Sequence, residues 1–537
     1  MAILRTDRKC SAKTPPKSRR VEAPWLVLLA CALAQLPAGV KAPLLAAPNP
    51  ISLENARSGS PQWELSNPAL GHEIEGYADK VSAAPGETLR LYVSSLSPRF
   101  TVEVFRMGWY GGAGARRVLE LRSLAGVQRA IPKPRGDDGL VECNWPLSCR
   151  LPVGSDWVTG VYLARLTGSR DGKQSFVPFV VREGSGERGG ASRRAPILVQ
   201  CSATTWQAYN NWGGKSLYDF NSFGGRALRV SFDRPYAMSS QGGRGAGAGE
   251  FLSVSHASRA GGWEYPFVRW IEKSGYDVAY ATNPDVHRDG SLCLRRKAVL
   301  LVGHDEYWSR AMRNHLERAR DQGVNLGVFA ANVGYWQVRF EPSAFGVKDR
   351  IVFCAKDADR DSVYNTAKDA DLTVRFRNLN PPRPEVSLVG MMMSAEDVES
   401  DFTPIPEMRS HWVYRGTGIA SGRTRAVPGI LGYEVDRSFA KDKTYGPWSP
   451  RKLSVLARTW VLPMKGERVP TETTIYAARS GAMVFAAGTM QWSWGLDDWG
   501  APALRPTRRH PDIEGITKNV LERFLGTGPG PNPRSPG

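Results

Sequence analysis

The sequence predicts an α/β protein in which a region of β-strands precedes a domain built on a parallel sheet. Residues 73–182 alternate apolar and polar side chains in short runs separated by turn residues, which is typical of antiparallel strands. Residues 298–302 (AVLLV) and 326–329 (LGVF) are continuous apolar runs, as in strands buried on both faces. The segment between these two runs has the apolar spacing of an amphipathic helix, so we expect a strand–helix–strand unit.

Residues 1–47 read as a basic leader followed by an apolar stretch. Seven Lys and Arg residues lie within the first 20 positions, and residues 23–40 are apolar apart from Gln35. This order predicts an export signal, of Sec or twin-arginine type, and the competing interpretation is an uncleaved membrane anchor. Export would place the protein in the periplasm or outside the cell. No later segment is long and apolar enough to span a bilayer.

Residues 60–183 form the predicted β-sandwich, with an immunoglobulin-like architecture. The turn GWYGG at residues 108–112 is either a packed corner of this sandwich or part of a binding edge, and we favour the corner. Cys143 and Cys149 flank a short loop, and their spacing predicts a disulfide in an oxidising compartment. Residues 184–194 are a Gly-, Ser- and Arg-rich linker to the next domain.

The second predicted domain spans residues 195–525, with a sheet of at least four strands. We expect Ser309 to cap a helix over residues 310–322 that ends at Gly323. Residues 204–222 are expected to form a polar, aromatic loop, and residues 526–537 a disordered tail. We expect further strands at 195–200, 276–281, 474–478 and 483–487, and helices at 265–274 and 514–525.

Polar side chains follow the strands of this domain, at the edge of a parallel sheet where ligands bind. They are Tyr209, Asn210, Lys215 and Tyr218 after the first strand, His304, Asp305 and Glu306 after the next, and Asn332 after a third. Phenol and carboxylate oxygens beside an imidazole suit Fe(III), Mn or Mg better than a thiolate-bound zinc. A hard Lewis acid could polarise a carbonyl here, and His304 could carry protons. The alternative interpretation is a solvated turn without chemistry.

Other chemistries have less support in the sequence. Ser309 lacks the glycine-bounded turn of a serine nucleophile, and no Cys stands at residues 304–307, where a glutaminase nucleophile would be. Residues 356–361 begin like a calcium loop, but Lys368 stands where a bidentate acid belongs, which excludes an EF-hand. The net charge of +19 would suit nucleic acid or an anionic polymer. Because Lys and Arg are scattered and no nucleic-acid-binding motif occurs, we expect no nucleic-acid partner.

Three motifs carry a family resemblance: TTWQAYNNWGGKSLYDFNS, VGHDEYWS and FAANVGYWQVRFE. They resemble the beta subunit of N,N-dimethylformamidase and its wider family, over about residues 60–525. The resemblance implies a C-terminal domain similar to class I glutamine amidotransferases, which is a flavodoxin-like three-layer sandwich. It also implies an iron (Fe³⁺) site held by Tyr209, Tyr218 and Glu306. The implied catalytic residues are His304, Glu306, Lys356 and Glu434.

These observations predict an exported, metal-dependent hydrolase that cleaves the C–N bond of a small amide by metal-activated water. The competing hypothesis is a non-catalytic envelope protein that binds glycan or another anionic polymer through its sandwich and basic surface. Membrane association through the N-terminal segment and assembly into an oligomer are left open by the sequence.

Overall fold

The computed structural model describes residues 49–184, 194–237, 245–252, 262–463 and 466–528. Outside these residues lie the predicted leader (1–47), almost all of the predicted linker (184–194) and most of the predicted tail (526–537). The structure therefore does not test the predicted export signal. Within the described residues, no helix is long and apolar enough to cross a membrane.

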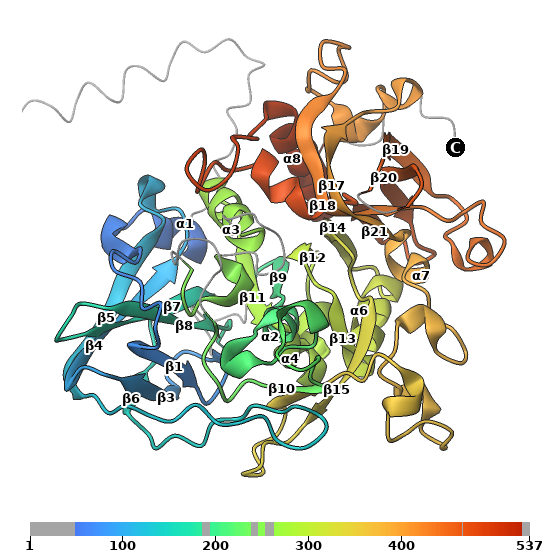
Figure 1. The fold of residues 1–537 in the computed structure, drawn as a ribbon. Coiled ribbons are helices and arrows are strands. Elements are labelled where there is room, and N and C mark those ends of the chain that lie inside the picture. Colours follow the sequence, from blue (N-terminus) through green and yellow to red (C-terminus); the bar gives the residue numbers. More distant parts are fainter. Residues whose placement is uncertain (1–48, 185–193, 238–244, 253–261, 464–465, 529–537) are drawn as a thin grey trace, which may run out of the picture. The chain divides into compact units, whose positions relative to one another are not determined.

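The first part of the described chain consists of a short helix, α1 (Pro50–Asn55), and two β-sheets that share one core (Figure 1). The strands are β1 Ile74–Ala78, β2 Ser82–Ala83, β3 Thr88–Ser95, β4 Arg99–Met107, β5 Ala115–Ala125, β6 Cys149–Pro152, β7 Gly160–Gly168 and β8 Gln174–Val181. They pair in the orders β1-β3-β6 and β2-β8-β7-β4-β5. Alternate side chains of β3, namely Leu89, Leu91 and Val93, are buried against the larger sheet, which explains the period of two in the sequence. The predicted β-structure of residues 73–182 is confirmed, and its likeness to immunoglobulin domains stays a prediction.

A seven-stranded sheet forms the centre of the second part. Its strands are β9 Ile197–Cys201, β11 Val278–Thr282, β12 Ala298–His304, β14 Asn325–Ala331, β19 Ser454–Val461, β20 Val469–Ala477 and β21 Met483–Ala486. Their order is β11-β9-β12-β14-β21-β20-β19. The first five strands are parallel to one another, and β20 pairs antiparallel with both β21 and β19. The α/β class and all the strands predicted for this domain are thereby confirmed.

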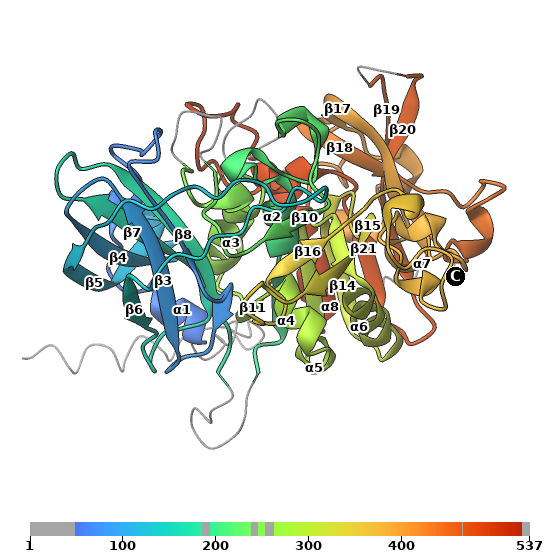
Figure 2. The ribbon, with the colours of Figure 1, turned by 60° about the horizontal axis from the view of Figure 1, so that its bottom comes forward.

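Helices cover both faces of this sheet. They are α2 Ala203–Tyr209, α3 Glu264–Lys273, α4 Asn283–Arg288, α5 Ser291–Leu294, α6 Arg310–Asp321, α7 Val386–Val389 and α8 Pro511–Leu525. Leu300 and Val302 of β12 pack in one core with α3 and α8, whereas Val299 and Leu301 pack in another with α4 and α6. The sheet thus lies between two layers of helices (Figure 2). Its likeness to flavodoxin stays a prediction.

The predicted strand–helix–strand unit is present as β12, α6 and β14, and β12 and β14 pair in parallel. Ser309 caps α6 as expected, because its Oγ accepts a hydrogen bond from the Met312 N–H at 3.2 Å. The first strand runs two residues further than predicted, so His304 is its last residue.

Two smaller sheets complete the second part. A four-stranded sheet has the strands β10 Arg229–Ser231, β13 Tyr307–Ser309, β15 Trp336–Glu341 and β16 Ile351–Phe353, in the order β10-β16-β15-β13. A two-stranded sheet pairs β17 (Met392–Phe402) with β18 (Val427–Arg437). Of the predicted site residues, Glu434 lies on β18, Glu306 directly precedes β13 and Lys356 lies three residues past β16.

The two parts of the chain meet in a buried ion pair. Arg106 of β4 donates to both carboxylate oxygens of Glu272 in α3, at 2.9 Å each, and both side chains are fully buried. Tyr110, in the GWYGG turn, donates to Glu54 of α1 and accepts a hydrogen bond from Arg106. The turn is therefore a packed corner, as favoured from the sequence. Residues Asn49–Gly537 form one compact unit, and the domain boundaries stay predictions.

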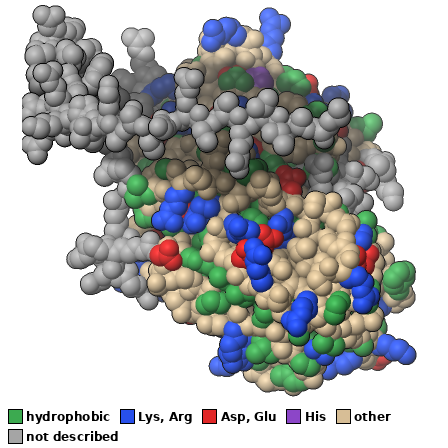
Figure 3. Space-filling view, turned by 90° about the vertical axis from the view of Figure 1, so that its left-hand side faces the viewer, with side chains coloured by type: hydrophobic (Ala, Val, Ile, Leu, Met, Phe, Trp, Pro, Cys, Tyr) green, Lys and Arg blue, Asp and Glu red, His purple; other side chains and the backbone are tan. Residues whose placement is uncertain are grey.

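The predicted disulfide between Cys143 and Cys149 is wrong, because both cysteines are free thiols. Cys143 is buried among Tyr77, Trp145 and Trp212, whereas Cys149 packs against the sandwich core. The two side chains thus belong to different apolar clusters. On the face in Figure 3, which is the sandwich side, Lys and Arg side chains are scattered and Asp and Glu lie among them.

Candidate active site

Three oxygen-bearing side chains meet at the carboxyl end of the central sheet. Tyr209 is the last residue of α2, Tyr218 follows in the next loop, and Glu306 follows β12. The Tyr209 hydroxyl lies 2.7 Å from that of Tyr218 and 2.8 Å from Glu306 Oε2. The Tyr218 hydroxyl lies 2.9 Å from both Glu306 oxygens. We call these three side chains the oxygen triangle.

The backbone around Glu306 is held in place from several directions. Its N–H donates to Thr205 Oγ1 at 3.0 Å, and its carbonyl accepts the N–H groups of Tyr335 and Trp336 at 2.9 and 3.1 Å. The carboxylate of Asp305 points the other way and accepts hydrogen bonds from Gln200 and Asn283. Asp305 therefore anchors the turn, and Glu306 is left to face the two tyrosines.

His304 is buried among carboxyl groups. Its Nδ1 lies 3.4 Å from Glu250, and its Nε2 lies 3.3 Å from Glu306 and 3.8 Å from Glu434. Burial by itself opposes protonation, but the contacts with Glu250 and Glu306 raise the pKa of His304 well above its usual value. Burial also opposes ionisation of Glu306, yet the hydrogen bond with His304 lowers the pKa of that carboxyl. The pair is thus held as imidazolium and carboxylate.

Glu434 carries the opposite shift. Burial, together with the charge of Glu306, raises the pKa of Glu434 to about 8, although His304 opposes this change. Glu434 lies on β18, and Asn332 lies just past β14. The Asn332 N–H donates to Asp436 at 3.0 Å, and burial raises the pKa of Asp436 to about 7. Two buried acids with raised pKa values thus lie on β18, and Glu434 is the one beside His304.

Lys356, three residues past β16, completes the group. Its ammonium lies 3.4 Å from the centre of the Tyr218 ring, a close cation–π contact. Burial lowers the pKa of Lys356 to about 8, against the effect of Glu306, which raises it. The structure therefore brings together all six residues that the resemblance implies: Tyr209, Tyr218, His304, Glu306, Lys356 and Glu434.

Two residues of the predicted polar edge lie elsewhere. Asn210 donates to Gln207 and to the Pro235 carbonyl, and Lys215 donates to the carbonyls of Gly224 and Gly225. The segment predicted as a loop from residue 204 begins instead with α2, all of whose residues are buried. This helix is what directs the Tyr209 ring toward Glu306.

Sequence reasoning missed Glu250, which lies in a short 3₁₀-helix (Gly249–Phe251) and is only 4% exposed. It follows a glycine-rich stretch of the sequence, and a lone Glu there gives no pattern. The only available signal was its position between two expected secondary-structure elements, and that signal does not single out one acid.

The oxygen triangle fits a hard cation. Two phenol oxygens and one carboxylate, all within 2.9 Å of a neighbour, are the donor types that Fe³⁺ prefers. Tyr209 and Glu306 are 3% and 2% exposed, so such a cation would be shielded from solvent. In the described part of the chain, no group of three or more His, Cys, Asp and Glu side chains is suited to a metal ion, which leaves the phenols as the distinctive donors.

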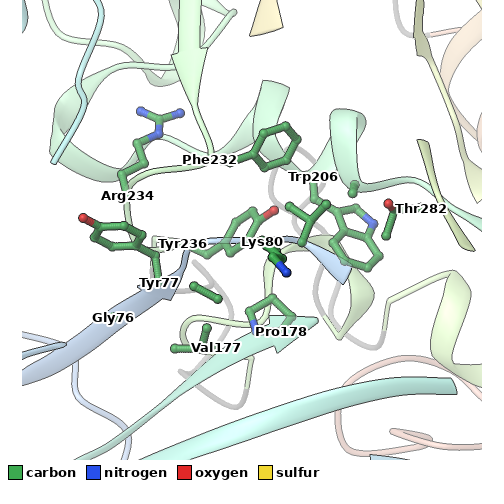
Figure 4. Close-up of a pocket in the computed structure, with 13 residues that line it drawn as sticks. Gly76, Tyr77, Lys80, Val177, Pro178, Trp206, Phe232, Arg234, Tyr236 and Thr282 are labelled. Atoms are coloured by element: carbon green, nitrogen blue, oxygen red, sulfur yellow. The ribbon is translucent and has the colours of Figure 1, made fainter. Parts of the chain in front are cut away.

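A separate small cavity lies where the sandwich meets the α/β part (Figure 4). It is lined by Tyr77, Lys80 and Pro178 on the sandwich side and by Trp206, Arg234 and Tyr236 on the other. Its volume is about 20 Å³, room for about one water molecule. None of the six predicted site residues lines it, so it is distinct from the candidate active site.

Known proteins share this sequence pattern. The model of the family "N,N-dimethylformamidase beta subunit-like, C-terminal" matches residues 101–507. The N,N-dimethylformamidase beta subunits of an Alcaligenes species and of Paracoccus aminophilus are 23% and 24% identical to the chain over 471 and 467 residues. Each alignment covers 74% of this chain but 56% of the relative, so the chain spans about half the length of these relatives. Since the family model covers most of the sequence, the chain belongs to the N,N-dimethylformamidase beta subunit-like family.

Proposed function

We propose that this protein is an iron-dependent hydrolase that cleaves the C–N bond of small amides. The observation that carries the proposal is the oxygen triangle of Tyr209, Tyr218 and Glu306. When bound there, Fe³⁺ would supply a Lewis acid that polarises the amide carbonyl and makes water more acidic. One water is consumed: a C–O bond forms at the carbonyl carbon, the C–N bond breaks, and a carboxylic acid and an amine leave.

The protein's own groups supply the proton transfers. His304 Nε2 faces both Glu306 and Glu434, so a proton can pass between this nitrogen and either carboxyl group. Glu434, with a pKa of about 8, keeps its proton at neutral pH and is placed to return one to the leaving amine through His304. The ammonium of Lys356, beside Tyr218, stabilises negative charge that develops near the oxygen triangle.

Iron content tests the proposed ligands. We expect purified protein to contain tightly bound iron, and Glu306→Gln and Tyr218→Phe each to lose most of it, because each removes one oxygen ligand or its charge. Tyr92→Phe is the matched control: Tyr92 stacks on Tyr77 in the sandwich, away from the site, and this variant should keep its iron. Iron retained at full occupancy in both site variants would rule out this ligand set.

Hydrolysis of a panel of small amides, followed by release of the amine, tests the reaction itself. We expect iron-loaded protein to release amine and the iron-free Glu306→Gln variant to release none. Protein that binds no metal even after supplementation would count against the hydrolase and favour the envelope-binding alternative.

We also propose export and assembly into an oligomer. Export is supported by the basic and apolar N-terminal sequence, and assembly by the relatives, which are named as subunits. N-terminal sequencing of protein from cell fractions tests the first, and light scattering of the purified protein tests the second. Unprocessed protein confined to the cytosol would contradict export.

A further inference from the structure

A row of three side chains leads from the oxygen triangle toward solvent. Tyr307 of β13 pairs with Trp336 of β15, and Trp336 pairs in turn with Arg375 in an isolated bridge. Directly paired residues project their side chains to the same face of a sheet. Tyr307 is fully buried, Trp336 is partly buried and Arg375 is exposed. The row therefore runs from the interior to the surface on one face.

This face is the one that carries the candidate active site. The Tyr307 ring lies 6.4 Å from that of Tyr209 and 6.3 Å from that of Tyr218, both close to edge-on. The ammonium of Lys356 lies 5.5 Å from the Tyr307 ring and 5.0 Å from the Trp336 ring. The inner and middle residues of the row, Tyr307 and Trp336, are thus direct neighbours of groups in the site.

Arg375 is the outermost member of the row and is held by aromatic rings. Its guanidinium carbon lies 5.3 Å from the centre of the Trp336 ring and 5.0 Å from that of Tyr335. Because Lys356 lies 5.0 Å from the same Trp336 ring, the two cations are no more than about 10.3 Å apart. Stacking fixes the plane of a guanidinium and leaves its N–H edge available to a planar anion.

None of the salt bridges among the residues that the structure describes includes Arg375. Its charge therefore has no carboxylate partner among those residues. Its neighbour Arg377 differs, since it donates to Glu385 at 2.8 Å and is neutralised by it. A cation that is exposed, in contact with two aromatic rings and without a carboxylate partner, one ring away from the active-site Lys356, is suited to bind a carboxylate near the site.

We propose that Arg375 binds a carboxylate of the substrate, so that the amide hydrolysed at the oxygen triangle carries a carboxylate at its other end. This inference rests on the proposed amide hydrolysis. Arg375 is then a specificity-determining residue. The substrates would be amides of dicarboxylic acids and similar anionic amides, rather than neutral amides.

Matched amides test the inference. The probes are succinamate, glutaramate and adipamate, each compared with the neutral amide of the same chain length: butyramide, valeramide and hexanamide. We expect the protein to prefer the carboxylate member of at least one pair. Arg375→Gln should lower kcat/KM for that member about tenfold or more, chiefly through KM, because a charge-assisted pair is lost. The neutral member should be unaffected, and Arg375→Lys should recover part of the loss.

Arg150→Gln is the control, since Arg150 is an exposed Arg on β6 of the sandwich, and it should change neither reaction. Equal rates within every pair, or an equal loss on both members in Arg375→Gln, would overturn the inference. Binding of the same compounds, measured by calorimetry, separates it from the proposed function. If the protein binds the carboxylate compounds selectively through Arg375 but hydrolyses none of them, the proposed amide hydrolysis is refuted and the carboxylate-binding site stands. If it shows no binding and no hydrolysis, both proposals are refuted.

Discussion

The buried ion pair between Arg106 and Glu272 tests how the sandwich is joined to the α/β part. Glu272 also accepts hydrogen bonds from the Tyr280 hydroxyl at 2.9 Å and from the partly buried Asn55 at 2.7 Å, so its carboxylate satisfies three donor side chains at once. Glu272→Gln keeps the size of the side chain but removes its charge and turns one acceptor into a donor. Arg106 is then left buried without a counter-charge.

Removing one member of a buried pair costs about 3–5 kcal/mol of folding free energy. We expect Glu272→Gln to lose an amount in this range, measured by urea unfolding followed through tryptophan fluorescence. Glu522→Gln is the control: Glu522 lies 3.7 Å from Lys518 in an exposed pair, whose loss should cost about 0–0.5 kcal/mol. A loss below about 1 kcal/mol in Glu272→Gln would refute the reasoning, since it would mean that water or another group compensates Arg106.

Three further predictions follow from other parts of the fold. Burial raises the pKa of Glu264 to about 8. Between pH of about 4.5 and 8 the unfolded state has therefore lost this proton while the folded state keeps it. The free energy of unfolding should fall by about 1.4 kcal/mol per pH unit in this range because of this group. Glu264→Gln should abolish that share of the pH dependence in urea unfolding at pH 5, 7 and 9, and an unchanged slope would contradict it. Gly303 has a φ of 69°, and a Cβ there would lie 2.6 Å from the Trp263 Cβ. Gly303→Ala should therefore lower the free energy of unfolding by about 1–3 kcal/mol. It should also reduce hydrolysis, because it displaces the neighbouring His304. Alkylation of the denatured, unreduced protein should label both Cys143 and Cys149, and a disulfide-linked peptide in the mass spectrum would contradict the structure.

The strand–helix–strand unit was predictable because its signals are local. The strands around Leu300 and Val328 are buried on both faces and therefore read as continuous apolar runs, and Ser309 marks the helix start by its own hydrogen bond. His304 and Glu306 lie within two residues of a strand end, so the edge of the sheet fixes where they lie. For these residues, position in the sequence determines position in the fold.

Other parts of the site depend on contacts that leave no local pattern. Helix α2 is buried on every side, so it lacks the amphipathic stripe by which a helix is recognised, and it was read as a loop. Glu250 reaches His304 from a turn far away in the sequence. The spacing of Cys143 and Cys149 could not show that their side chains enter different apolar clusters. Burial and long-range packing decide these features, and neither is encoded in residue spacing.

The site is therefore assembled from two kinds of segment with different tolerances to change. Glu306 and His304 are fixed by β12 of the central sheet, which is fully buried, whereas Tyr209 and Tyr218 depend on the packing of α2 and the loop after it. Thr205 of α2 joins the two, since its hydroxyl accepts the Glu306 N–H, whereas Asp305 ties the turn after β12 to Gln200 of β9 and to Asn283 of α4. A change that loosens α2 should accordingly separate the phenols from Glu306 while leaving the sheet intact, and would remove the oxygen triangle without unfolding the protein.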